Sequence, residues 1–205
     1  MTEETRKGLL VDFGGVLTTD VFASFAAFCE QEGLETGTVR DRFMKDPKAR
    51  ELLADLETGK LTEEQFEPKF AAVLEVSPDN LVDRLFAGMR PDEQMLAALE
   101  AARRAGVKTG LISNSWGKGR YDRSKFPELF DGVVISGEEG MRKPEPRMYE
   151  LGAERVGLNP AECVFVDDLP FNLKPARALG MATVLHRDAD QTIPELERLL
   201  GVSLS

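Results

Sequence analysis

Short apolar runs alternate with amphipathic segments along most of the chain. The runs cover residues 8–12, 107–112, 132–135, 163–166 and 181–185. Uninterrupted apolar runs of this length, bounded by turn residues, are typical of strands buried on both faces of a parallel sheet. Helical periodicity covers residues 92–105, 147–156, 173–179 and 193–200. This alternation predicts an α/β fold with a doubly wound parallel sheet, covered by helices on both faces.

Residues 18–89 interrupt the alternation, because no convincing strand pattern occurs there. Four or five helices are predicted instead, over residues 21–32, 38–44, 47–57, 63–74 and 78–86. Thr62 with Gln65 is typical of a capping box, and Ser77 before Pro78 is typical of a helix start. We therefore predict a small all-helical cap domain, residues 18–89, inserted after the first strand of a core domain that comprises residues 1–17 and 90–205.

The composition is that of a globular protein: 205 residues, 42% of them hydrophobic and 30% charged. The net charge of −10 argues against a nucleic acid or a membrane surface as the partner. The first apolar run is too short for a signal peptide or a membrane-spanning helix. Cys29 and Cys163 lie far apart in the sequence and are predicted to be buried thiols. A reducing, cytoplasmic location is therefore expected.

Polar residues with catalytic potential follow four of the predicted strands. Since ligands bind at the carboxyl ends of the strands in an open α/β sheet, we expect these clusters to form one site. In chain order they are Asp12, Ser113 with Asn114, Lys143, and Asp167 with Asp168.

The clusters resemble the motifs of the haloacid dehalogenase-like (HAD) hydrolase superfamily, most of whose members are Mg²⁺-dependent phosphatases with a Rossmann-like core. The matching stretches are DFGGVL at residues 12–17, ISNS at 112–115, GMRKPEP at 140–146 and VDD at 166–168. They follow the order and spacing of the family over most of the chain. The stretches GMRKPEPRMY and VFVDDLPFNLKPARALGM are very similar to the N-terminal phosphatase domain of soluble epoxide hydrolases.

The resemblance implies the roles of the catalytic groups. Asp12 would be the nucleophile that attacks phosphorus and forms an aspartyl-phosphate, because a carboxylate is ionised at neutral pH without a base. Lys143 would neutralise charge on the transferred phosphoryl group and orient Asp12. Ser113 and Asn114 would hold the phosphoryl oxygens.

The resemblance also implies a Mg²⁺ site. Two adjacent carboxylates at a strand end are costly to bury unless a cation neutralises them, and Mg²⁺ prefers oxygen ligands. Asp12, the main-chain carbonyl of Gly14 and Asp168 would bind the ion. Asp167 would be an additional ligand of the ion, or it would contact the ligands without binding the ion itself.

Gly14 departs from the family pattern. Phosphatases of the superfamily usually carry a second Asp there, which protonates the leaving oxygen and later activates water; such groups contribute about 10²–10⁴-fold. One hypothesis is that the substrate has a good leaving group, as in acyl or aryl phosphates. Another is that a carboxylate from elsewhere substitutes, with Asp20 as the first candidate.

The expected function is Mg²⁺-dependent hydrolysis of a small phosphorylated metabolite by a monomer or homodimer. Gly14 keeps a second possibility open, a HAD-fold phosphate-binding or interaction module with weak or no turnover. A metal-free haloacid dehalogenase is disfavoured, because those proteins carry an aromatic residue at the position of Gly14 and need no aspartate pair.

Three further features lie outside the motifs. Residues 103–125 hold seven basic residues and one acidic residue, so this segment is a candidate for attracting an anionic substrate. Phe22, Phe25 and Phe28 follow helical spacing and are expected to serve packing. Trp116 is equally compatible with a place beside the ligand and with packing. His186 is assigned no role.

Overall fold

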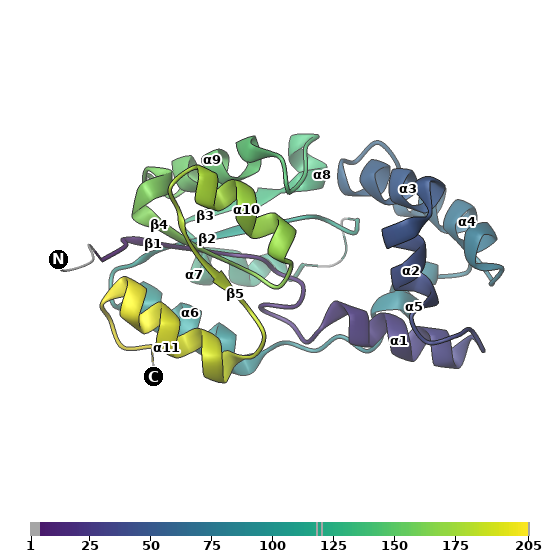
Figure 1. The fold of residues 1–205 in the computed structure, drawn as a ribbon, viewed down its shortest axis with the longest axis horizontal. Coiled ribbons are helices and arrows are strands. Elements are labelled where there is room, and N and C mark those ends of the chain that lie inside the picture. The colour runs from purple at the N-terminus through teal and green to yellow at the C-terminus, as the bar shows by residue number, and fades with distance from the viewer. Residues whose placement is uncertain (1–4, 118, 120, 205) are drawn as a thin grey trace.

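The computed structural model describes residues 5–117, 119 and 121–204. A five-stranded, fully parallel sheet with strand order β3-β2-β1-β4-β5 forms the centre of the larger part of the molecule (Figure 1). The predicted α/β fold is confirmed. Its strands are β1 (Gly8–Val11), β2 (Lys108–Ser113), β3 (Gly132–Ile135), β4 (Cys163–Asp167) and β5 (Ala182–Leu185).

Helices cover both faces of the sheet, because alternate side chains of each strand point to opposite sides. Leu9 and Val11 pack with α6 (Glu93–Arg104) and α11 (Ala189–Leu200), on the face that also carries α7 (Phe126–Leu129). Leu10 packs on the other face with α9 (Pro146–Arg155) and α10 (Pro170–Ala178). Burial on both faces explains why the strands read as continuous apolar runs.

Five helices stand beyond the carboxyl ends of the strands (Figure 1). We call residues 18–89 the helical insert. Its helices are α1 (Val21–Gln31), α2 (Thr38–Lys45), α3 (Pro47–Glu57), α4 (Glu63–Leu74) and α5 (Leu81–Phe86). They enclose an apolar core of their own that includes Phe28, Phe66 and Phe70.

The chain leaves the sheet and returns to it at adjacent points. Asp92 N donates to Leu17 O (3.0 Å), and Thr19 N donates to Arg90 O (2.8 Å). These contacts lie at the predicted junctions, after residue 17 and before residue 90. The division into a core domain and a cap domain stays a prediction.

Several helix ends differ from the prediction. The predicted capping box of Thr62 and Gln65 is present, but α5 begins at Leu81 and not at Pro78. Ser77 Oγ instead donates to the Asp79 carboxylate within a turn. The short helix α8 (Ser136–Glu139) and the 3-10 turns η1 (Arg123–Lys125) and η2 (Pro160–Glu162) were not predicted, because short elements carry little periodicity.

Two predictions about the chain as a whole can be compared with the structure. Cys29 and Cys163 are buried free thiols, as predicted. Among the described residues, no helix has the length and apolar character needed to cross a bilayer.

Candidate active site

Asp12 lies where β1 ends, beside the end of β4. Val11 pairs with Val166 in the parallel register, so the residues that follow them, Asp12 and Asp167, are neighbours. Asp12 N donates to Val166 O (2.9 Å), and the carboxylate accepts from Phe13 N at Oδ1 (2.7 Å). The predicted convergence of two strand ends therefore follows from the strand order.

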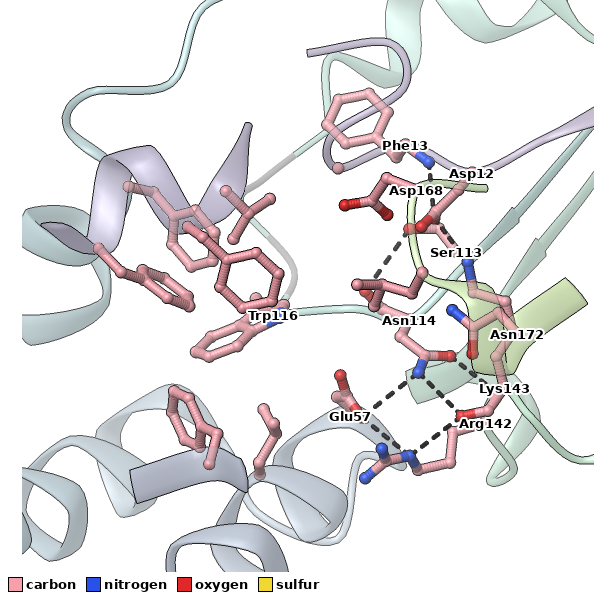
Figure 2. Close-up of a pocket in the computed structure, with 18 of the residues that line it drawn as sticks. Asp12, Phe13, Glu57, Ser113, Asn114, Trp116, Arg142, Lys143, Asp168 and Asn172 are labelled. Atoms are coloured by element: carbon pink, nitrogen blue, oxygen red, sulfur yellow. Dashed lines mark hydrogen bonds and ion pairs between the residues drawn. The ribbon is translucent and has the colours of Figure 1, made fainter. Parts of the chain in front are cut away.

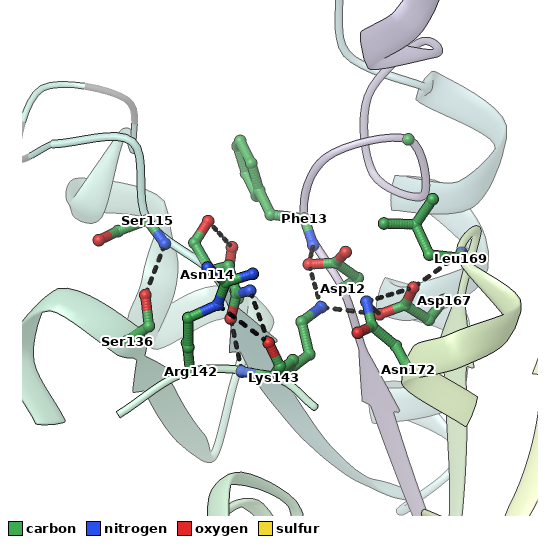
Figure 3. A network of polar contacts seen from close by, with 12 residues as sticks. Asp12, Phe13, Asn114, Ser115, Ser136, Arg142, Lys143, Asp167, Leu169 and Asn172 are labelled. Atoms are coloured by element: carbon green, nitrogen blue, oxygen red, sulfur yellow. Dashed lines mark hydrogen bonds and ion pairs between the residues drawn. The ribbon is translucent and has the colours of Figure 1, made fainter. Parts of the chain in front are cut away.

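Lys143 joins these two carboxylates (Figure 3). Its Nζ lies 2.8 Å from Asp12 Oδ1 and donates to Asp167 Oδ2 at 2.7 Å. The Lys143 side chain is 1% exposed and that of Asp167 is fully buried, so neither charge is solvated. Asp167 Oδ1 also accepts from Leu169 N (2.9 Å) and from Asn172 Nδ2 (3.0 Å). Asp167 thus holds the ammonium group in front of Asp12.

Three carboxylates come together at this point. One oxygen each from Asp12, Asp167 and Asp168 lie within 4.8 Å of one another. Burial, with the charges of Asp167 and Asp168, raises the pKa of Asp12 to about 8 despite Lys143. Burial and Asp167 raise the pKa of Asp168 to about 6. Burial by itself lowers the pKa of Lys143, but the carboxylates of Asp12 and Asp167 raise it above its usual value.

The loop after β1 is shaped to admit Asp168. Gly15 has a φ of +74°, in the left-handed region that favours glycine. A Cβ on Gly15 would lie 2.6 Å from Asp168 Oδ2, so this carboxylate packs directly against the loop that carries Gly14. The close approach places the oxygen of Asp168 next to the main chain that was predicted to supply the carbonyl ligand.

The Ser113-Asn114 turn lies on the other side of Asp12. Ser113 Oγ shares a hydrogen bond with Tyr121 Oη (2.9 Å). Asn114 brackets the main chain of Lys143: Oδ1 accepts from Lys143 N (2.8 Å), and Nδ2 donates to Lys143 O (3.1 Å). Asn114 therefore positions Lys143, and its contact with a phosphoryl group stays a prediction.

A pocket of about 550 Å³ opens from these residues toward the helical insert (Figure 2). Apolar side chains form most of its wall, including Phe22, Phe25, Phe43, Phe86 and Trp116. Trp116 lines the pocket and packs on Phe25, Phe43, Phe66 and Phe86, so its packing role is confirmed. Its place beside a ligand stays a prediction. The packing role expected for the phenylalanines of α1 holds for Phe28; Phe22 and Phe25 also line the pocket.

A carboxylate from the helical insert reaches the polar side of the pocket. Glu57, the last residue of α3, is 5% exposed, and its Oε2 lies 2.9 Å from Arg142 Nε. Asn114 Nδ2 donates to the same oxygen (3.4 Å). Burial raises the pKa of Glu57 to about 7, against the opposing charges of Arg142 and Lys143. Figure 2 shows Glu57 and Arg142 on one side of Asn114, with Asp12 and Asp168 on the other.

Asp20, the candidate to replace the Asp that is missing at Gly14, does not line the pocket. Asp20 is exposed and caps α1, where its Oδ1 accepts from Phe22 N (2.7 Å). Its side chain caps the helix terminus and does not line the pocket, although its charge contributes to raising the pKa of Asp168. That Asp20 replaces the usual Asp stays a prediction. His186, assigned no role, is buried away from the pocket, and its Nδ1 bonds Thr192 Oγ1 (2.9 Å).

Four basic residues of the segment 103–125 are paired with acidic residues. The attraction of an anionic substrate by this segment stays a prediction. Arg103 and Lys108 pair with Asp131, Arg104 pairs with Glu100, and Arg123 pairs with Glu138. None of these four basic residues lines the pocket. Residues 118 and 120 lie outside the described part of the chain. In the described part of the chain, the basic groups in the pocket wall are Arg40, Arg142 and Lys143.

Glu57, Tyr121, Arg142 and Asn172 are among the pocket residues that sequence reasoning missed. Asn172 had a detectable signal, because α10 begins at Pro170 and its first turn faces the end of β4. Glu57 had none, since it is separated by 57 residues from Asn114 and lies in the insert.

Comparison with known proteins agrees with this geometry. A family model, haloacid dehalogenase-like hydrolase, matches residues 6–180. Bifunctional epoxide hydrolase 2 of Sus scrofa is 30% identical over 97% of this chain, which spans 39% of that protein. A sesquiterpene phosphatase of Aspergillus oryzae is 33% identical, over 55% of this chain and 59% of its own length.

The fold also matches solved structures. A HAD family enzyme of Bacteroides thetaiotaomicron, crystallised as a magnesium complex, superposes with a TM-score of 0.65 over 90% of this chain and 94% of its own. At 22% identity, this likeness concerns the fold. Because the family match spans most of the sequence and the sheet agrees with it, this chain belongs to the haloacid dehalogenase-like hydrolase family.

Proposed function

We propose that this chain is a Mg²⁺-dependent phosphatase that cleaves small phosphate monoesters through an aspartyl-phosphate on Asp12. The observation that carries the proposal is the fixed contact of Lys143 with both Asp12 and Asp167 at the bottom of the pocket. A buried ammonium group beside a buried carboxylate suits a reaction in which the carboxylate attacks a phosphoryl group that carries negative charge.

The donor set fits Mg²⁺. Lys143 supplies one positive charge against the three carboxylates that lie within 4.8 Å of one another, and their oxygens are the ligands that a hard cation prefers. We assign the binding to Asp12, Asp168 and the carbonyl of Gly14. Asp167 is assigned to holding Lys143, because hydrogen bonds already occupy both of its oxygens. When bound, the ion offsets negative charge on the phosphoryl oxygens.

The proposed reaction has two displacements at phosphorus. A carboxylate oxygen of Asp12 forms a bond to phosphorus as the bond to the ester oxygen breaks, and the departing oxygen takes up a proton. Water then attacks the aspartyl-phosphate, which releases inorganic phosphate and restores Asp12. Lys143 stays paired with Asp12 and stabilises the charge that develops on the phosphoryl group. Since Gly14 offers no acid, leaving groups of low pKa are favoured.

Phosphate release from p-nitrophenyl phosphate tests the proposal. Wild-type protein should release phosphate with Mg²⁺ and lose this activity with EDTA or in Asp12→Asn. Asp20→Asn retains the cap of α1, and unchanged turnover in this variant would exclude Asp20 as the replacement for the usual Asp. Mg²⁺ binding measured by calorimetry, together with no phosphate release from any phosphomonoester, would overturn the proposal in favour of a binding module.

A further inference from the structure

We propose that Glu57 restricts the substrate to phosphate monoesters whose organic group carries no second negative charge. The inference rests on the proposed function and names the substrate class of the same site. Glu57 acts in it as a specificity-determining residue, because its carboxylate neutralises Arg142 in the pocket wall.

The first step concerns the pocket wall. Beyond the polar end, the pocket is lined by aromatic and aliphatic side chains of the insert and of α10, which cannot solvate a charge. Its mouth is apolar as well: Met44 and Phe171, 55% and 50% exposed, are the large hydrophobic residues most exposed in the described chain, and both line it. A buried charge without a partner costs several kcal/mol, so a second anionic group needs a cation here.

The second step concerns the cations that could serve. Lys143 is engaged by Asp12 and Asp167. Arg142 borders the pocket, and its Nε lies 2.9 Å from Glu57 Oε2. The pair has no net charge, so Arg142 offers a second anion little attraction, and Glu57 repels it.

The third step concerns how Glu57 is held. Its main-chain carbonyl accepts from Ser136 Oγ, and Ser136 Oγ accepts in turn from Ser115 N (2.8 Å). A Cβ on Gly59 would lie 2.7 Å from Gly137 O, so the end of α3 rests directly on α8. The carboxylate is therefore anchored to the wall of the pocket.

Among the residues that the structure describes, Arg40 is the other cation in the pocket wall. It is exposed, lines the pocket, and its Cζ lies 5.1 Å from the centre of the Phe22 ring. If Arg40 bound a second anion, the wild-type protein would prefer doubly anionic substrates, and the proposal would be overturned.

Two isosteric esters test the proposal, 4-carbamoylphenyl phosphate and 4-carboxyphenyl phosphate, which differ by one charge on the ring. Because their phenols also differ in pKa, the change of the kcat/KM ratio between wild type and Glu57→Gln is the decisive readout. We expect wild-type kcat/KM to favour the carbamoyl ester at least tenfold. Glu57→Gln should reduce this ratio to below threefold, mainly through a lower KM for the carboxyl ester. Glu57→Asp should restore the preference, and Glu51→Gln, an exposed residue of the same helix, should not change it. Equal kcat/KM values of the wild-type protein for the two esters would contradict the role of Glu57. A kcat/KM ratio that is the same in Glu57→Gln as in wild type would contradict it as well.

A second measurement needs no variant. The pKa of Glu57 lies near 7, with Arg142 and Lys143 as the charged groups that act on it. The carboxylate is therefore charged at pH 8 and protonated at pH 5.5, so the wild-type preference should narrow at the lower pH. Both esters carry the same phosphate group, whose own titration cancels in the ratio. A preference that stays constant with pH would count against the proposal even if Glu57→Gln does not fold.

Failure of catalysis can be distinguished from failure of selectivity. If neither ester is hydrolysed, the proposed function fails. The dissociation constants of 4-carbamoylbenzylphosphonate and 4-carboxybenzylphosphonate, measured with Mg²⁺ by calorimetry, then decide the role of Glu57. The same tenfold difference is expected in wild type, and its absence there or its persistence in Glu57→Gln would reject the proposal.

Discussion

Lys143 carries a buried charge, and its proposed role is to act on the reacting phosphoryl group. It is 1% exposed and lies between Asp12 and Asp167, while Asn114 holds its main chain on both sides. A buried ammonium group placed so rigidly can stabilise developing charge without reorganising, which is the main source of electrostatic catalysis. Single side chains at this end of the pocket should therefore change turnover more than they change stability.

The first prediction at this scale concerns Lys143→Met. Removing one preorganised charge at a reacting centre typically costs about 10²–10³-fold in kcat. We expect a loss of this size for p-nitrophenyl phosphate in a steady-state assay. Lys174→Met, an exposed lysine on α10, is the control and should retain wild-type kcat. Equal losses of kcat in both variants would show that the positive charge of Lys143 does not contribute to catalysis.

Gly14 leads to a second prediction at the residue scale. Without an acid, kcat/KM should fall steeply as the pKa of the leaving group rises. Gly14→Asp should flatten this dependence and raise activity on alkyl phosphates at least tenfold, as general acids contribute about 10²–10⁴-fold. Gly14→Ala is the control, since it adds the same Cβ, 3.1 Å from Val21 Cγ2, without a carboxylate. Identical slopes for wild type and Gly14→Asp would refute the leaving-group hypothesis.

At the scale of elements, the backbone conformation of the loop between β1 and α1 affects the position of the acidic cluster. Gly15 and Gly33 both have positive φ values, +74° and +70°. A Cβ meets Asp168 at Gly15 and meets nothing within 4 Å at Gly33. The two positions thus separate backbone strain from steric contact with the site.

The third prediction uses this pair. Gly15→Ala and Gly33→Ala should each lower the free energy of unfolding by about 1 kcal/mol, the cost of a left-handed conformation for an L-residue. Only Gly15→Ala should also weaken Mg²⁺ binding and reduce kcat/KM, by at least tenfold, because Asp168 must move. Denaturant unfolding and calorimetric Mg²⁺ titration measure the two effects. If the Mg²⁺ affinity of Gly15→Ala equals that of wild type, Asp168 is not a ligand of the metal ion.

At the scale of the whole molecule, the site lies between two apolar cores, one around the sheet and one in the helical insert. The sheet supplies the acidic cluster, and the insert supplies Glu57 and much of the pocket wall. The burial that this arrangement imposes on the carboxylates links metal binding to the stability of the fold.

The fourth prediction concerns metal removal. Burial raises the pKa of Asp12 to about 8 and that of Asp168 to about 6. Each folded-state pKa lies above the unfolded value near 3.8, so the folded state binds these protons more tightly. With EDTA, the stability that these groups contribute at low pH should be lost between about pH 4 and 8 as they ionise.

Thermal unfolding at several pH values measures this effect. Tm with EDTA should fall by several degrees between pH 5 and 8, and Mg²⁺ should raise Tm most at pH 8. Asp168→Asn should reduce both changes. An increase in Tm by Mg²⁺ that is the same at pH 5 and pH 8 would contradict the prediction.

The sequence by itself determined the parallel sheet, because strands buried on both faces must be continuously apolar. It also determined the strand-end positions of Asp12, Ser113 and Asp167 and placed Lys143 in the segment after β3, since parallel strands terminate at a common edge. The pattern of apolar and polar residues within one segment is enough to predict a buried strand and the point where it ends, because the burial of a strand depends on its own residues.

Only the tertiary structure decided which groups meet across the pocket. Asp20 is near Asp12 in the sequence, yet it caps a helix, whereas the distant Glu57 reaches Arg142 and Asn114. Arg103 pairs with Asp131, which directly precedes β3, although the sequence position of Arg103 suggested a part in attracting an anion near Ser113. The contacts of Glu57 depend on how α3 packs against α8, and no local pattern of apolar and polar residues records the packing of distant elements.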